Sequence, residues 1–339
     1  MKIAFFEIFN EIQNKEREAL KKLFPNNQVC FFTEKLSEAN TDLVKDAEVV
    51  SVFTNSSIDQ KIIDLLPSLK FVNTSSTGFD HIDVDYCAKK GIKVSNVPAY
   101  GSVTVAEFTF ALLLNLSRKV EKANNQLRQD DDFNITALRG FDLRGRILGV
   151  IGTGKIGKNV IKIANGFGMN VIAYDLRSDP SFAEENNFKY KNFSEVVSES
   201  DILTLHIPYT KENHHLINKK NISAMKKGVY LINTARGALI DTGALLWGLQ
   251  ERIIAGAGLD VLEDERNLKE EMKILSSGGA DILKNYKTLL EDHVLIDMPN
   301  VIVTPHIAFY SKEAEEEIMK VTVNNIQSFI SGNPVNLVK

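Results

Sequence analysis

The stretch Arg146-Ile-Leu-Gly-Val-Ile-Gly-Thr-Gly-Lys-Ile-Gly157 decides the fold of the chain around it. An apolar run, Ile147 to Ile151, leads directly into Gly152, Gly154 and Gly157, in the pattern G-x-G-x-x-G, and a helical pattern follows. In a dinucleotide-binding turn the first glycine permits the tight turn, the second lets the backbone approach the pyrophosphate, and the third packs the helix against the sheet. The helix N-terminus then offers amide groups and a positive dipole to the phosphates.

The next predicted strand supports the same interpretation. It ends at Tyr174, and Asp175 follows 18 residues after Gly157, where such a fold carries the acid that binds the ribose hydroxyls. A 2'-phosphate beside this carboxylate would meet a repulsion of about 4 kcal/mol per pair of unit charges at an effective dielectric of about 20, an effect that Arg177 would soften. The sequence therefore predicts NAD in preference to NADP.

The length and composition limit the remaining possibilities. A chain of 339 residues with 44% hydrophobic and 25% charged residues predicts a globular protein of two domains. A net charge of -4 offers no basic field for nucleic acid and no polybasic membrane patch. Two cysteines, Cys30 and Cys87, are too few for a disulfide framework, and no apolar stretch is long enough for a membrane span. We expect a soluble, cytoplasmic protein with no nucleic-acid or membrane partner.

Short β-branched or aromatic runs alternate with longer amphipathic segments along the chain, as in repeated strand-helix-strand units. The first series of predicted strands is Lys2 to Phe9, Gln28 to Phe32, Val49 to Phe53, Phe71 to Asn73 and Lys93 to Ser95. The second is Ile147 to Ile151, Asn170 to Tyr174, Ile202 to His206, Val229 to Asn233, Ile254 to Leu259 and Val301 to Thr304. The fold class is therefore α/β with two doubly wound parallel sheets. A long helix, Ser102 to Lys119, is predicted to join them.

Three kinds of charged side chain follow strands of the second series. Arg236 follows one strand, the acids Glu263, Asp264 and Glu265 follow the next, and His306 follows the last. Because ligands of open parallel sheets bind beyond the carboxyl ends of the strands, we expect these groups in one crevice with the glycine turn. A guanidinium binds a carboxylate and polarises a carbonyl, while a protonated imidazole held by a carboxylate donates a proton. This set suits hydride transfer to a 2-keto acid, and spacing alone leaves the choice of acid open.

From about Leu69 onward the sequence resembles the D-isomer-specific 2-hydroxyacid dehydrogenases, with the closest likeness to D-lactate dehydrogenases. The resemblance rests on seven motifs in order, namely Gly78-Phe-Asp-His-Ile-Asp83, Val97-Pro-Ala-Tyr100, the glycine turn with Asp175, Leu205-His-Ile-Pro-Tyr-Thr210, Leu231-Ile-Asn-Thr-Ala-Arg-Gly237, Gly258-Leu-Asp-Val-Leu-Glu-Asp-Glu265 and Thr304-Pro-His-Ile-Ala-Phe-Tyr310. It implies that Arg236 anchors the substrate, that Glu265 is the partner of the histidine, and that His306 is the general acid/base.

The resemblance also implies the binding residues. Those for the cofactor are Gly152, Gly154, Lys155, Ile156 and Gly157 at the pyrophosphate, Asp175 at the ribose, His206, Ile207, Pro208 and Asn213 along the wall, and Thr234, Ala235 and Asp260 at the nicotinamide. Those for the substrate are the amides around Thr77 and Gly78, the walls Tyr100 and Phe309, and Arg236.

Other histidines have plainer interpretations. His214 and His215 are predicted in a solvated polar turn, and His81 as a helix cap. No His, Asp or Glu cluster has metal-ligand spacing, so the sequence predicts no metal. No serine or cysteine nucleophile sits in an elbow motif, so hydrolysis is unsupported.

The predicted function is the reversible, NADH-dependent reduction of a short 2-keto acid, pyruvate first, to the D-2-hydroxy acid. The alternatives are branched keto acids, hydroxypyruvate or glyoxylate as substrate, and a non-enzymatic, NAD-sensing protein like a corepressor. We expect a flavodoxin-like substrate domain of residues 1–100 completed by 307–339, and a Rossmann domain of residues 101–306 with an insertion at 266–299. The active-site cleft is expected between them, and a homodimer is expected on the apolar face of Val103 to Leu116.

Overall fold

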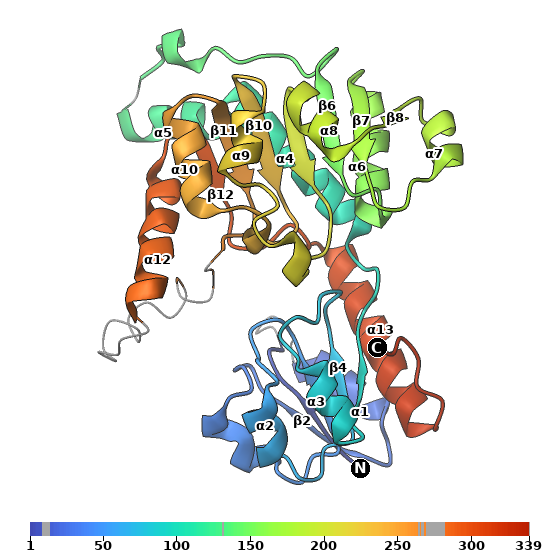
Figure 1. Ribbon diagram of the computed structural model, residues 1–339. Coiled ribbons are helices and arrows are strands. Elements are labelled where there is room, and N and C mark those ends of the chain that lie inside the picture. Colours follow the sequence, from blue (N-terminus) through green and yellow to red (C-terminus); the bar gives the residue numbers. More distant parts are fainter. Residues whose placement is uncertain (9–13, 131, 264, 266–267, 269–281, 339) are drawn as a thin grey trace. The chain divides into compact units, whose positions relative to one another are not determined.

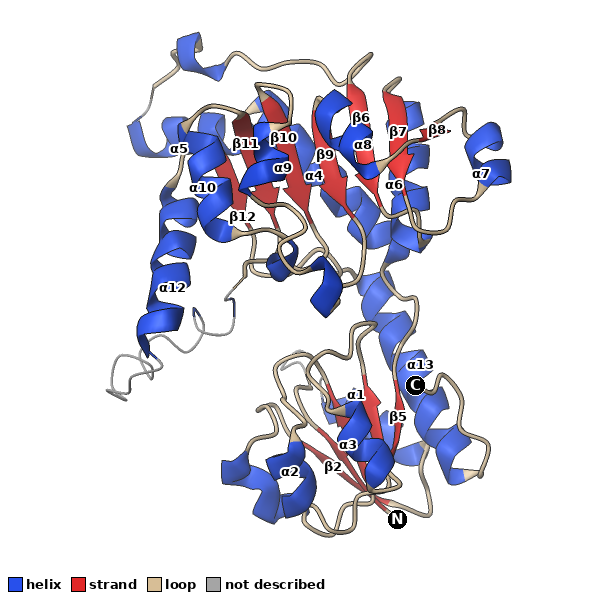
Figure 2. Ribbon diagram, in the orientation of Figure 1, coloured by secondary structure: helices blue, strands red, loops and turns tan. Residues whose placement is uncertain are grey.

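The computed structural model describes residues 1–8, 14–130, 132–263, 265, 268 and 282–338 (Figure 1). The chain divides into two compact units, Met1–Tyr100 with Ser311–Lys339, and Gly101–Tyr310. The second boundary therefore falls after Tyr310, whereas the sequence placed it after His306. Each unit contains one parallel sheet with helices on its faces (Figure 2), so the predicted α/β class with two parallel-sheet domains is confirmed.

The first unit has a five-stranded parallel sheet in the order β2-β1-β3-β4-β5. The strands are β1 Lys2–Phe5, β2 Gln28–Phe31, β3 Val49–Val52, β4 Phe71–Thr74 and β5 Lys93–Ser95. Its helices are α1 Asn14–Lys22, η1 Glu38–Val44, α2 Gln60–Leu65, α3 Val84–Lys89 and the C-terminal α13 Lys312–Ile330. Side chains alternate along each strand, so that Ala4, Val50 and Val72 belong to one apolar core and Ile3, Val49 and Phe71 to the other.

Buried contacts explain why the C-terminal helix belongs to the first unit. Phe329 on α13 stacks on Phe71 of β4, with ring centroids 4.4 Å apart. The buried Asn325 amide donates to Asn73 Oδ1 and to the Asn96 carbonyl, each at 2.9 Å. Satisfied polar contacts of this kind fix one position of the helix on the sheet, because a shift would leave buried groups unpaired.

The second unit has a seven-stranded parallel sheet in the order β12-β11-β10-β9-β6-β7-β8. The strands are β6 Ile147–Ile151, β7 Asn170–Tyr174, β8 Lys189–Tyr190, β9 Ile202–Leu205, β10 Val229–Asn233, β11 Ile254–Leu259 and β12 Val301–Val303. The chain order changes direction between β6 and β9, which is where an open parallel sheet forms its ligand crevice. The glycine turn follows β6 directly.

Helices cover both faces of this sheet. The helices are α4 Ser102–Arg118, α5 Val120–Asp130, α6 Lys155–Gly166, α7 Pro180–Glu185, α8 Phe193–Glu199, α9 Lys219–Ser223, α10 Thr242–Gln250 and α12 Ile282–Asp297, and the short 3-10 turns are η2 Thr136–Leu138, η3 Lys211–Asn213 and η4 Gly237–Leu239. Apolar residues of α4 and α6 form one core with the sheet, and those of α8, α9 and α10 form the other. No helix in the described ranges is long and apolar enough to cross a membrane.

The apolar face of α4, on which a second copy was expected, packs within the second unit. Phe110, Leu112 and Leu113 are buried inside the second unit, and only Val103, at 55% exposure, is an exposed large apolar residue of this helix. These residues of α4 lie on β10, β11 and β12 of the same chain.

Candidate functional site

The three glycines of the turn after β6 have three different surroundings. Gly152 has a φ of 95°, and a Cβ there would lie 2.6 Å from Ile207 Cγ2. A Cβ at Gly157 would lie 2.0 Å from the Gly152 carbonyl oxygen, so α6 packs against the turn at a distance that only glycine permits. A Cβ at Gly154, the N-cap of α6, would meet no atom within 4 Å. The turn is thus closed by protein at its first and third glycines and open at the second.

This arrangement fits the diphosphate of a dinucleotide. The open space beside Gly154 lies at the N-terminus of a twelve-residue helix, which begins at Lys155 and continues with Ile156. Amide groups and the helix dipole at that position favour a bound anion.

Replacement of Gly154 by alanine is expected to weaken NADH binding and to leave stability unchanged. The backbone there has a φ of -66°, which any residue adopts, and the added methyl group meets no protein atom. Crowding of the diphosphate by about 1–3 kcal/mol corresponds to roughly a 5- to 150-fold higher dissociation constant. Fluorescence titration with NADH measures the dissociation constant. Gly166→Ala, on the same helix and equally open, is the matched control, and equal affinities of the two variants would contradict this prediction.

Asp175 lies at the carboxyl end of β7 and is tied to the glycine turn. Its Oδ2 accepts from the Thr153 amide at 2.6 Å and the Thr153 hydroxyl at 3.0 Å, and its Oδ1 accepts from the Arg177 amide at 2.9 Å. Burial opposes ionisation, but the hydrogen bonds from Arg177 and Thr153 outweigh it and lower the pKa of Asp175. The carboxylate is therefore charged and held in place beside the turn.

The loop after β9 carries the predicted cofactor wall. Asn213 closes this loop on itself, since its Oδ1 accepts from the Thr210 amide at 2.7 Å and its Nδ2 donates to the Pro208 carbonyl at 2.8 Å. His206 Nε2 lies 2.9 Å from Thr204 Oγ1, and its buried Nδ1 has no hydrogen-bond partner among the described residues. Burial lowers the pKa of His206 to about 3, so its ring is neutral at physiological pH.

His206→Gln is expected to flatten the pH dependence of stability. Below a pH of about 6.5 the unfolded chain binds a proton on this histidine that the folded chain excludes. The stability of the native protein therefore falls with falling pH by up to about 1.4 kcal/mol per pH unit until the folded pKa is approached. Urea unfolding between pH 7 and pH 4.5 should show that the free energy of unfolding falls more steeply with falling pH for the native protein than for the variant. A difference in unfolding free energy between the two proteins that stays constant with pH would contradict the low pKa of His206.

Arg236 follows β10 on a loop that its neighbours hold closely. The buried Asn233 amide donates to the Arg236 carbonyl at 2.8 Å, and Asn233 Oδ1 accepts from the Ala235 amide at 3.0 Å. Arg236 Nη1 donates to the Ala235 carbonyl at 2.7 Å, and Thr234 Oγ1 lies 3.1 Å from Thr109 Oγ1 of α4. Arg236 is half-buried at the carboxyl end of the sheet.

Gly237 brings this loop against the chain that leaves β11. A Cβ at Gly237 would lie 2.0 Å from the Leu262 carbonyl oxygen and 2.5 Å from the Glu263 amide nitrogen. The segment that carries Arg236 thus lies in backbone contact with the segment that leads to Glu265.

Asp260 has a clearer structural role than the predicted cofactor contact. It is buried at the end of β11, where its Oδ1 accepts from the Thr304 hydroxyl at 2.6 Å and the Ile307 amide at 2.9 Å, and its Oδ2 from the Ala308 amide at 2.8 Å. Burial raises the pKa of Asp260, and these hydrogen bonds and the charge of His306 oppose the shift. Asp260 therefore holds the turn on which His306 lies.

His306 and Glu265 are in direct contact. His306 Nδ1 lies 3.2 Å from Glu265 Oε2, and the two side chains are 29% and 23% exposed. His306 has a φ of 58°, a left-handed conformation that the bonds to Asp260 on its C-terminal side hold in place. The Nε2 atom makes no hydrogen bond within the described ranges, so it is available to a ligand. Phe309 meets the histidine ring edge-on, with centroids 6.3 Å apart.

Thr77, Gly78 and Tyr100 belong to the first unit. The Thr77 hydroxyl donates to the Val97 carbonyl at 2.8 Å, and the Ser76 hydroxyl to the Gly78 carbonyl at 2.7 Å. These bonds fix the loop after β4. In the part of the chain that the structure describes, the amides of Thr77 and Gly78 donate to no protein acceptor. Tyr100 is half-buried at the end of this unit.

Sequence reasoning missed or misread several residues near these loops. Glu7, at a φ of 57°, accepts from the amides of Phe53, Asn55 and Ser56 at 2.8–3.0 Å and so fixes the loop after β3. His81 is a buried residue whose Nε2 lies 3.1 Å from Thr74 Oγ1, whereas Asp83 caps the helix that His81 was expected to cap.

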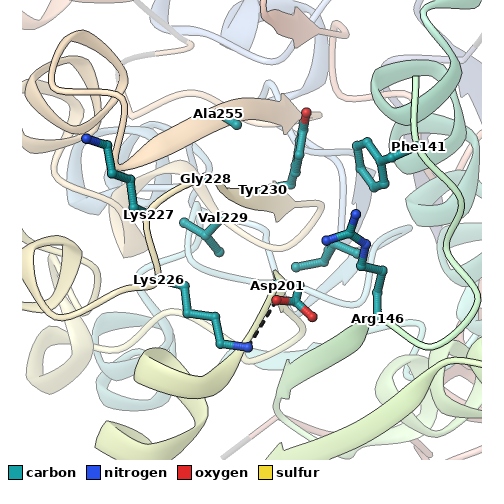
Figure 3. A pocket seen from close by; sticks show the side chains of 10 residues that line it. Phe141, Arg146, Asp201, Lys226, Lys227, Gly228, Val229, Tyr230 and Ala255 are labelled. Atoms are coloured by element: carbon teal, nitrogen blue, oxygen red, sulfur yellow. Dashed lines mark hydrogen bonds and ion pairs between the residues drawn. The ribbon is translucent and has the colours of Figure 1, made fainter. Parts of the chain in front are cut away.

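A cavity of about 240 Å³ lies at the opposite end of the second sheet (Figure 3). Its lining includes Arg146, Asp201, Lys226 and Gly228, which precede β6, β9 and β10, and Lys226 Nζ pairs with Asp201 Oδ1 at 3.0 Å. The predicted residues all follow the carboxyl ends of the strands, so this cavity is separate from the candidate site.

The comparisons with known proteins agree on one family. Residues 110–308 match the NAD-binding domain of the D-isomer-specific 2-hydroxyacid dehydrogenases. A 2-hydroxyacid dehydrogenase homolog of Haemophilus influenzae is 37% identical over 98% of this chain and 97% of its own length, and an aromatic 2-oxoacid reductase of Clostridium sporogenes is 39% identical over 85% and 84%.

A solved structure agrees with the sequence matches. The D-lactate dehydrogenase of Aquifex aeolicus, complexed with NAD and lactic acid, superposes with a TM-score of 0.86 at 35% identity, covering 99% of this chain and 100% of that one. The cofactor of this chain is NAD, in agreement with the open glycine turn. The chain belongs to the D-isomer-specific 2-hydroxyacid dehydrogenase family.

Proposed function

We propose that this protein reduces a short 2-keto acid, pyruvate first, to the D-2-hydroxy acid with NADH, in a reversible reaction. The observation that carries the proposal is the His306–Glu265 contact on the segments that leave β11 and β12, at the same end of the sheet as the glycine turn. A structural relative that holds both NAD and lactic acid supports a three-carbon substrate. The second unit would bind the cofactor and the first would contribute to substrate binding.

The residues of the candidate site have distinct chemical roles in the proposed reaction. Bound NADH supplies the hydride. Arg236 binds the keto acid by charge-assisted hydrogen bonds and polarises its carbonyl, and the amides of Thr77 and Gly78 bind its carboxylate. His306 Nε2 donates a proton to the C2 oxygen as the hydride reaches C2, while Glu265 holds Nδ1 and stabilises the protonated ring. In the reverse direction the neutral imidazole accepts the hydroxyl proton.

A keto-acid panel tests this function. We expect purified protein to oxidise NADH, followed by its near-ultraviolet absorbance, fastest with pyruvate and more slowly with branched keto acids, hydroxypyruvate or glyoxylate. Because one methylene changes binding by about 1–3 kcal/mol, 2-ketobutyrate should retain part of the rate. Chiral chromatography should show the D-enantiomer. NADH binding without turnover of any keto acid would instead support an NAD-sensing protein.

Two additions to the panel, phenylpyruvate as substrate and NADPH as cofactor, test the assignment further. A preference for phenylpyruvate would place the chain with its relative that is an aromatic 2-oxoacid reductase. An equal or faster rate with NADPH would contradict the NAD preference that we assign to the charged Asp175 carboxylate.

We also propose a cytoplasmic homodimer. Cys30 and Cys87 are free thiols, which suits a reducing compartment. Phe133 and Ile135 are 84% and 78% exposed, and Gln126 of α5 donates to the Asp132 and Asn134 carbonyls, which flank Phe133. Two neighbouring apolar side chains with this exposure support a contact with a second copy at this position.

The double variant Phe133→Ser/Ile135→Ser is expected to be a monomer, because the apolar contacts between copies are lost. Sedimentation velocity at micromolar concentration measures the change. Leu43→Ser, at a 60% exposed position of the first unit, serves as control and should remain a dimer. A native protein that sediments as a monomer would contradict the proposal.

A further inference from the structure

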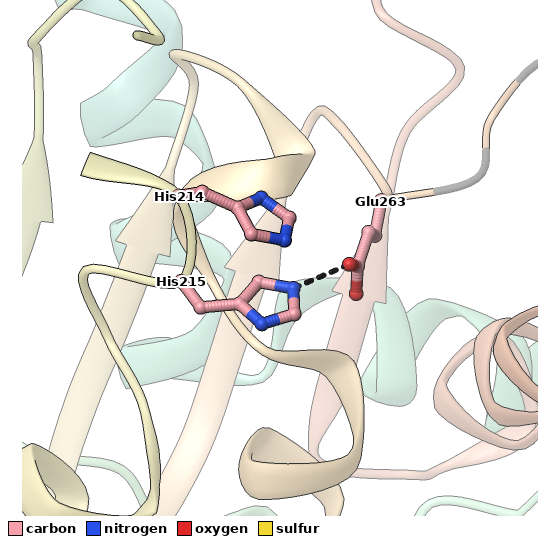
Figure 4. Close-up of side chains that lie close together, drawn as sticks. All are labelled: His214, His215 and Glu263. Carbon is pink, nitrogen blue, oxygen red and sulfur yellow. Dashed lines mark hydrogen bonds and ion pairs between the residues drawn. The ribbon is translucent and has the colours of Figure 1, made fainter. Parts of the chain in front are cut away.

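We propose that His214, His215 and Glu263 form a binding site for a divalent transition-metal ion of the Zn²⁺ type. The ligand atoms of these three residues all lie within 4.8 Å of one another, and both imidazoles face the Glu263 carboxylate (Figure 4). His215 Nε2 lies 2.5 Å from Glu263 Oε1. The two histidines were predicted in a solvated turn, but His215 is instead paired with a residue 48 positions away.

The backbone explains how neighbouring residues present two imidazoles to one point. Consecutive side chains of an extended chain point to opposite sides. His215 has a φ of 53°, however, and the rings of His214 and His215 are stacked with centroids 3.8 Å apart and planes 24° apart. The His215 amide donates to the Ala238 carbonyl at 2.9 Å, and its carbonyl accepts from Asn218 Nδ2 at 3.1 Å, so this conformation is held on both sides.

Polar groups lie behind the Glu263 carboxylate and beside the Nδ1 atoms of both histidines. Glu263 Oε2 accepts from the Thr242 hydroxyl at 2.8 Å, which leaves Oε1 facing the histidines. Asp241 Oδ2 lies 3.9 Å from His215 Nδ1, and the Tyr209 hydroxyl lies 3.4 Å from His214 Nδ1. The Nε2 atoms of both rings are therefore the ligating atoms. Metal-binding histidines are commonly oriented in this way through their other nitrogen.

The donor set and its charge fit a zinc-type ion. Two imidazoles and one carboxylate form a known zinc ligand set with a fourth position open to water. Zinc distances of about 2.0–2.2 Å separate two ligands of a tetrahedral ion by roughly 3.4 Å. To reach that separation, His215 Nε2 and Glu263 Oε1 would move apart by less than 1 Å from their present distance. The exposed His214 would move toward them. With Asp241 nearby, two carboxylates balance the charge of the ion.

Calorimetric titration of the chelator-treated protein with Zn²⁺ tests the site directly. We expect one Zn²⁺ per chain. Loss of an orienting group already weakens metal sites 10- to 100-fold, so His214→Ala and Glu263→Gln should each weaken binding by at least about 10-fold. His293→Gln removes an imidazole outside the cluster and should leave the affinity unchanged.

A spectroscopic measurement distinguishes the loss of a metal ligand from a folding defect. His214→Ala leaves the His215–Glu263 contact intact, so it should unfold at the native temperature. Co²⁺ in the native protein should give the intense visible absorption of tetrahedral coordination, and this absorption should be absent from His214→Ala. The proposal is wrong if no stoichiometric Zn²⁺ binding occurs, or if His214→Ala and His293→Gln bind Zn²⁺ equally well. None of these readouts depends on dehydrogenase activity.

Discussion

Replacement of His306 by glutamine should lower kcat for keto-acid reduction by roughly 10²- to 10⁴-fold, the usual contribution of a general acid. Glutamine retains a hydrogen-bond donor near the position of Nε2 but cannot release a proton to the C2 oxygen. Substrate binding should therefore change less than turnover, and the loss should appear in kcat more than in KM. Steady-state kinetics with saturating NADH measures both parameters.

The His306→Gln variant needs two comparisons. His293→Gln makes the same substitution on α12, away from the glycine turn, and should keep native turnover. The NADH dissociation constant of His306→Gln should also remain native, because the change leaves the glycine turn intact. Near-native turnover of His306→Gln would remove this residue from the proton-transfer step.

Replacement of Arg236 by glutamine should lower kcat/KM for the keto acid by roughly 30- to 5,000-fold. Loss of one partner from a buried charge pair costs about 2–5 kcal/mol, which converts to that range. The loop itself should survive, since Asn233 binds the main chain of residues 235 and 236 and not the guanidinium. Arg236→Lys should recover only part of the loss, because an ammonium group cannot bind a carboxylate in two parallel hydrogen bonds.

The Arg236 variants are judged against an arginine elsewhere on the same unit. Arg252→Gln, at an exposed position after α10, should keep the native kcat/KM. Isothermal titration with NADH should give equal affinities for all variants. If Arg236→Lys is fully active, the bidentate recognition assigned to this guanidinium is wrong.

Buried parallel strands were the part of the fold that the sequence revealed most completely. β6, β7, β10 and β11 have the predicted bounds, because a strand covered on both faces is a continuous apolar run with clear ends. β1 ends at Phe5 and not at Phe9, since Glu7 turns into a left-handed conformation. Phe9 itself lies outside the described residues. The two-residue β8 has no periodicity that a sequence could show.

The limits of sequence reasoning are clearest where the acidic run leaves β11. Spacing could not choose among Glu263, Asp264 and Glu265, and family resemblance alone selected Glu265. The structure places Glu265 against His306 and Glu263 against His215, while Asp264 lies outside the described residues. Such contacts depend on how distant loops meet, and the pattern along one segment carries no information about its partner. The same holds for Asp260, whose hydrogen bonds join residues 44 to 48 positions apart.

The most direct measurement is a crystal structure of the protein with NAD and oxamate, an unreactive analogue of pyruvate. We expect the Arg236 guanidinium and His306 Nε2 both to hydrogen-bond the analogue's oxo oxygen, with its C2 facing the nicotinamide and Glu265 still on His306 Nδ1. An analogue bound beside the nicotinamide without contact to Arg236 and His306 would contradict this expectation.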